Sequence, residues 1–96
     1  MTDKLEQEIA RGQRAAQLLA EPIIVEAFET LKSGVLNEWL KSPARDAEGR
    51  EKLYLVMKAT ECVEMHLRNI MESGKLAEHA LRNGVARKDG LPPSVF

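Results

Sequence analysis

Apolar and small side chains in the second half of the chain recur at alternating steps of three and four residues. They form one stripe: Leu53, Val56, Thr60, Val63, Leu67, Ile70, Gly74, Ala77 and Leu81. This is the heptad spacing of a helix that packs lengthwise against another helix. It predicts a long helix over residues 46–73. Beyond Ser73-Gly74, the pattern allows a bend into a short extension to residue 83 or one unbroken helix that stops at Asn83-Gly84.

The first half predicts two shorter helices. Asp3, with Glu6 three positions on, is typical of a capping box that starts a helix over 3–20; Thr2 is an alternative cap. Gly12 lies in the narrow apolar stripe of this helix and indicates a close approach to a neighbouring backbone. Pro22 favours the start of a second helix over 22–41. Its inner face is predicted to contain Ile24, Phe28, Leu31, Val35 and Trp39.

The link between the second and third helices is short, which favours an antiparallel turn. Asp46 is the predicted N-cap of the third helix, and Ser42-Pro43 is an alternative start. The fold class is therefore all-α: an antiparallel helical hairpin or small three-helix bundle with a long third helix. Residues 1–84 are predicted to form one helical domain, and residues 85–96, which have no period, an extended C-terminal tail.

Charge and motif content narrow the function classes. The 14 basic and 15 acidic side chains leave a net charge of −1, which argues against a general nucleic-acid coat protein. Lys75, Arg82, Arg87 and Lys88 form a basic segment that is an alternative nucleic-acid site, although a solvated helix end is favoured. No catalytic, cofactor or metal-ligand spacing occurs, so we predict neither an enzyme nor a metal or cofactor site. The lone Cys62 is predicted to be buried or half-buried.

Several residues together resemble small all-helical proteins of structural or unknown role encoded in tailed-bacteriophage genomes. They are Arg11-Gly12, Leu18-Leu19, Pro22, Ala27-Phe28, Leu31, Trp39, Ser42-Pro43, Asp46, Arg50-Glu51 and Gly74-Lys75-Leu76-Ala77. The resemblance implies a phage or prophage origin and a place among head, packaging or connector proteins. It carries no catalytic residue. The location then expected is the host cytoplasm or the virion, because no apolar run approaches the ~20 residues of a membrane span and the first residues are not typical of a signal peptide.

The function predicted from these patterns is structural. The chain is expected to assemble with itself as a homo-oligomer, or with a larger phage protein. Alternatives are a nucleic-acid-associated packaging or regulatory protein and an inhibitor that binds a host protein. A charge at Val63 or Leu67 is expected to cost several kcal/mol if the stripe is buried. The predicted protein interface consists of Leu53, Val56, Val63, Leu67, Ile70 and Leu81 with the tail residues Leu91, Val95 and Phe96.

Overall fold

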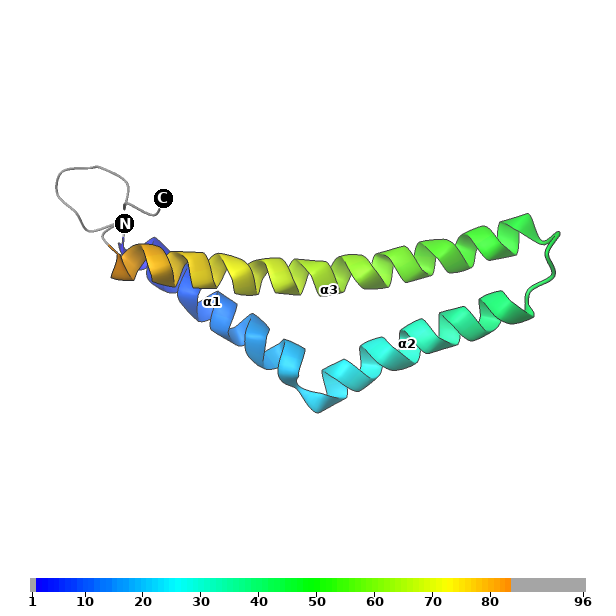
Figure 1. Cartoon of the computed structure of the whole chain (residues 1–96), viewed down its shortest axis with the longest axis horizontal. Helices are drawn as coiled ribbons and strands as arrows, with labels where there is room; N and C mark the ends of the chain where they lie inside the picture. Colours follow the sequence, from blue (N-terminus) through cyan, green and yellow to red (C-terminus); the bar gives the residue numbers. More distant parts are fainter. Residues whose placement is uncertain (1, 84–96) are drawn as a thin grey trace. The chain divides into compact units, whose positions relative to one another are not determined.

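The computed structural model describes residues 2–83, which form three α-helices and no strand. They are α1 (Thr2–Ala20), α2 (Pro22–Lys41) and α3 (Ala47–Arg82) (Figure 1). The all-α prediction is thereby confirmed. The predicted tail, residues 85–96, lies outside the described residues. The chain divides into two compact units: one contains α1 up to Gln17 and α3 from Leu67 onwards, and the other is Leu18–His66.

In the first unit, α1 packs against α3 through small residues. A Cβ atom added to Gly12 would lie 2.7 Å from the Gly74 Cα and 3.2 Å from the Ile70 carbonyl oxygen. Ala15 and Ala77, each three residues from one of these glycines along its helix, are 3% and 4% exposed. The close backbone approach predicted at Gly12 is confirmed, and its partner is Gly74.

This contact explains why α3 is longer than predicted. The expected end at residue 73 is wrong, because the helix continues through Ser73-Gly74 to Arg82. Gly74 is a packing residue of the helix interior instead of a C-terminal cap, since only a residue without a side chain lets α1 come so close. Of the two alternatives the sequence leaves open, the unbroken helix is the one observed. The start of α1 also differs slightly: the helix begins at Thr2, and Asp3 lies in its first turn.

In the second unit, α2 and the first part of α3 run in opposite directions. Pro22 is the first residue of α2, as predicted. Ser42 ends it: the Ser42 backbone N–H donates to the Trp39 carbonyl oxygen over 3.1 Å, and the Ser42 hydroxyl donates to the same oxygen over 2.6 Å. Between the helices, Val35 of α2 and Thr60 of α3 are buried. The Thr60 hydroxyl donates to the Val56 carbonyl oxygen over 2.8 Å, so its polar group is satisfied within the helix.

Asp46 caps α3, as predicted. Its side-chain oxygen Oδ1 accepts a hydrogen bond of 3.0 Å from the Gly49 backbone N–H. We expect Asp46→Ala to lower the free energy of unfolding by about 1 kcal/mol, because this N–H loses its partner. Thermal melting should show a midpoint lower by roughly 4–8 °C. Asp46→Asn keeps the acceptor and should melt close to the unmodified protein; an equal loss in both variants would contradict the capping role.

Three other predictions about burial are wrong or incomplete. Cys62 is exposed, because it lies about 100° round the helix from Val63 and the stripe ends at that edge. Val56 and Val63 are 43% and 54% exposed, so α3 buries the centre of its stripe without burying this edge. Leu31, predicted to lie inside, is 48% exposed.

Candidate interaction surface

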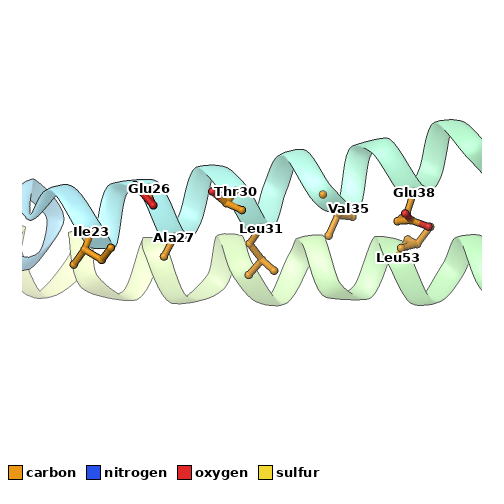
Figure 2. A pocket seen from close by; sticks show the side chains of 9 residues that line it. Ile23, Glu26, Ala27, Thr30, Leu31, Val35, Glu38 and Leu53 are labelled. Carbon is orange, nitrogen blue, oxygen red and sulfur yellow. The ribbon is translucent and has the colours of Figure 1, made fainter.

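The second unit carries an open apolar groove of about 610 Å³ along α2, bordered on the α3 side by Leu53. Side chains of Ile23, Ala27, Leu31 and Val35 extend from α2 towards α3, with Leu53 on the α3 side (Figure 2). The remaining lining residues are Glu26, Thr30, Gly34 and Glu38. Gly34 widens the groove, since a Cβ atom added there would meet nothing within 4 Å.

An ion pair on the opposite side of the α2–α3 pair shows which residues of α3 lie on the groove side. Lys32 of α2 pairs with Glu64 of α3. Leu31 precedes Lys32 and Val63 precedes Glu64, and a step of one residue turns about 100° round a helix. In antiparallel neighbours these two turns lead to the same side of the pair. Val63 therefore lies on the groove side, and so does Val56, one heptad earlier.

We call Ile23, Ala27, Leu31, Val56 and Val63 the groove face. Of these, Ile23 is 62% exposed, Val63 54% and Leu31 48%. These values are high for large aliphatic side chains that gather on one side of a helix pair. Isolated exposed aliphatic residues are ordinary on protein surfaces, but a contiguous patch indicates a binding surface.

On the opposite side of the same helix pair, one cation–aromatic contact joins α2 to α3 and another lies within α3. The Arg50 guanidinium lies 4.0 Å from the centre of the Trp39 ring, and its Nη1 donates to the Ser42 hydroxyl over 3.0 Å. The Lys58 ammonium lies 5.5 Å from the centre of the Tyr54 ring. A smaller hollow of about 210 Å³ lies here, lined by Val35, Leu36, Trp39, Leu53, Tyr54 and Met57. The aromatic rings on this side therefore already contact cationic side chains. The groove face, in contrast, consists of aliphatic side chains.

Most of the large apolar side chains that are exposed belong to the second unit. Among the described residues the buried hydrophobic side chains are Ala15, Val35 and Ala77, and none of the large ones is fully buried. All but one of the large exposed ones lie within Leu18–His66: Ile23, Val25, Leu31, Leu36, Leu40, Tyr54, Leu55, Val56, Val63 and Met65, with Leu76 outside. The second unit therefore presents more apolar surface than its own two helices cover.

The predicted interface residues fall into three groups. Leu53, Val56 and Val63 belong to the second unit and border the groove or lie on its side. Leu67, Ile70 and Leu81 belong to the first unit, where they are half-buried. The tail residues Leu91, Val95 and Phe96 lie outside the described residues.

Sequence reasoning missed Ile23, Ala27 and Leu31 as surface residues of the groove. They recur at four-residue steps, which was the available signal. The apolar face of α2 is wide enough to contain both these three residues and the buried Val35.

In the described part of the basic segment, Lys75 and Arg82 each form an exposed pair with a carboxylate of the same helix. The Lys75 ammonium lies 3.5 Å from a Glu72 carboxylate oxygen, and the Arg82 guanidinium lies 3.5 Å from a Glu78 carboxylate oxygen. His79 is hydrogen-bonded to Asn83 over 2.9 Å. Arg87 and Lys88 lie outside the described residues.

Other kinds of site find no support between residues 2 and 83. No group of three or more His, Cys, Asp or Glu side chains in this range could hold a metal ion. Within the same limits, no helix is long and apolar enough to cross a membrane. Comparison of the chain with protein families, curated proteins and solved structures found no match. Among the described residues, the groove face is therefore the candidate interaction surface that the geometry favours.

Proposed function

We propose that this protein is a helical interaction module, in which the antiparallel hairpin of α2 and α3 binds a helical partner through its groove face. The observation that carries this proposal is the apolar groove of about 610 Å³, whose lining side chains Ile23 and Leu31 are 62% and 48% exposed. Val63 of α3, which helix geometry places on the same side, is 54% exposed. An amphipathic helix laid into a groove buries such side chains by the same periodicity that forms the hairpin.

The chemistry of the groove supports a helix as the ligand. Its lining is aliphatic along the centre, and Glu26, Thr30 and Glu38 supply polar groups along α2. A polar rim around an apolar centre is the usual composition of a protein–protein interface. The self-assembly and the larger phage partner expected from the sequence use this same surface. A structural role in an assembly is the corresponding biological function.

Site-specific photo-crosslinking tests this function. A benzophenone amino acid is placed at Leu31, in the groove, and at Asn37, which lies on α2 about 200° from Val35 and is exposed. In cells that carry the gene, illumination should give protein adducts of discrete mass from position 31 and none from position 37. Val63→Glu, in the chain labelled at position 31, should abolish these adducts.

Two results would contradict the proposal. One is the same set of adducts from both positions, which would indicate unspecific collisions. The other is the absence of adducts from position 31 in a chain shown by circular dichroism to be folded. An adduct of twice the chain mass identifies a second copy as the partner, and a heavier one identifies a different protein.

A further inference from the structure

We propose that the occupant of the groove is a second copy of this chain, in a two-fold pairing that lays α2 of each copy antiparallel along α3 of the other and sets Glu38 opposite Lys52 of the second copy. The inference rests on the proposed function and names its partner. Two hairpins joined in this way make a four-helix arrangement in which every helix is antiparallel to both of its neighbours.

The register within one hairpin is set by observed contacts. Lys32 pairs with Glu64, and Arg50 stacks over Trp39, so residue numbers fall along α3 as they rise along α2. Val35 lines the smaller hollow together with Leu53 and Met57, and Trp39 one turn further along α2 lies under Arg50, which places Val35 near the level of Leu53 and Met57. Three residues further along α2, Glu38 reaches the level of Lys52. In the other direction, Glu26 lies within a turn of the level of His66.

A two-fold axis parallel to the helices keeps these levels. The groove face of one copy then meets the groove face of the other, with each α2 over the partner's α3. The acidic groups beside the groove are Glu26 and Glu38 on α2, and the corresponding positions of α3 carry Lys52 and His66. Glu38 of each copy meets Lys52 of the other, so the symmetric complex contains this pair twice.

Charge also rejects the competing arrangement. If α2 lay on α2 of the second copy, the carboxylates of Glu26 and Glu38 would line both sides of the contact, and like charges across an interface disfavour it. Lys52 is available for the proposed pair: its present partner is Glu48 at 3.6 Å, and the two side chains are 75% and 84% exposed. Such an exposed intrahelical pair contributes little and is easily exchanged.

Mixing two charge-reversed chains tests the pairing. E38K and K52E are prepared as full-length proteins, and each is expected to dimerise at least about tenfold more weakly than the unmodified chain, because each homodimer contains two repulsive pairs. Mixed in equal amounts, they should form a heterodimer close to the unmodified affinity, since both cross pairs become attractive. Sedimentation equilibrium gives the masses, and an isotope-labelled chain identifies the heterodimer by native mass spectrometry.

The control exchanges Glu29, which lies on the opposite side of α2, for lysine. E29K keeps Glu38 and Lys52 and should dimerise alone like the unmodified chain. With K52E it should form a weaker heterodimer than E38K does, because one of the two cross pairs then joins two carboxylates. A heterodimer of E29K and K52E as strong as that of E38K and K52E, or failure of E38K and K52E to form a heterodimer, would overturn the proposed register. A monomeric unmodified chain at about 100 times the concentration used for the mixing test would overturn self-pairing itself. That last result leaves the interaction module intact if position 31 still crosslinks to a heavier protein, so the two proposals fail separately.

Discussion

Val35→Asp should lower the free energy of unfolding by about 3–5 kcal/mol, because it places an unpaired carboxylate between α2 and α3. Val35 is 9% exposed and is the buried residue of α2. A domain of this size has a total stability of only about 5–15 kcal/mol. The loss is therefore a large part of the total stability, and urea denaturation followed by circular dichroism should show a clearly lower midpoint.

Leu40→Asp is the matched control on the same helix. Leu40 is 72% exposed, so its side chain loses little contact and the new charge stays in water. The expected loss is below about 1 kcal/mol, mainly from an acidic group near the C-terminal end of a helix. Equal destabilisation by the two substitutions would mean that Val35 does not hold the helix pair together.

Gly12→Ala should lower the free energy of unfolding by about 2 kcal/mol. The added Cβ atom would lie 2.7 Å from the Gly74 Cα, closer than two carbon atoms can pack, so α1 and α3 must separate along their contact. Overpacking of this kind costs roughly 1–3 kcal/mol, more than the gain in helix propensity from glycine to alanine. Thermal melting measures the loss.

Gly34→Ala supplies the opposite sign for the same chemical change. Gly34 lies inside α2, and nothing lies within 4 Å of an added Cβ atom. Within the single chain only the helix propensity acts there, so at concentrations where the chain is monomeric the free energy of unfolding should rise by about 1 kcal/mol. If both substitutions stabilise the chain, the close approach of Gly12 and Gly74 is not present in solution.

The starts of α2 and α3 could be predicted because they depend on local chemistry. Pro22 fits only the first turn of a helix, and the Asp46 carboxylate reaches a free N–H two or three residues on. The stripe of α3 was predictable for the same reason: a heptad spacing depends on helix geometry alone. Gly12 predicted a close contact between helices. For its partner Gly74 the sequence also allowed a helix end, since glycine occurs both at close helix contacts and at helix C-termini.

The covered edge of the stripe was not predictable from apolar spacing. Met57 and Glu64 lie on the edge of the α3 stripe that α2 covers. Val56 and Val63 lie on the exposed edge, although valine is more apolar than glutamate. Glu64 tolerates the covered position because Lys32 of α2 pairs with it. Hydrophobic patterning gives no weight to such cross-helix ion pairs, so it assigned the interior edge to the two valines. For the same reason, apolar spacing did not predict that Val56 and Val63 belong to an exposed groove face.

Thermal melting of Val63→Glu and the unmodified chain over a range of protein concentrations tests the central claim most directly. If the groove face is an interface between copies, the unmodified midpoint rises with concentration by mass action. The midpoint of the variant then stays constant and equals the dilute unmodified value, because an exposed charge does not disturb the single chain. A variant that melts lower by the same amount at every concentration would contradict the claim, since Val63 would then support the fold itself.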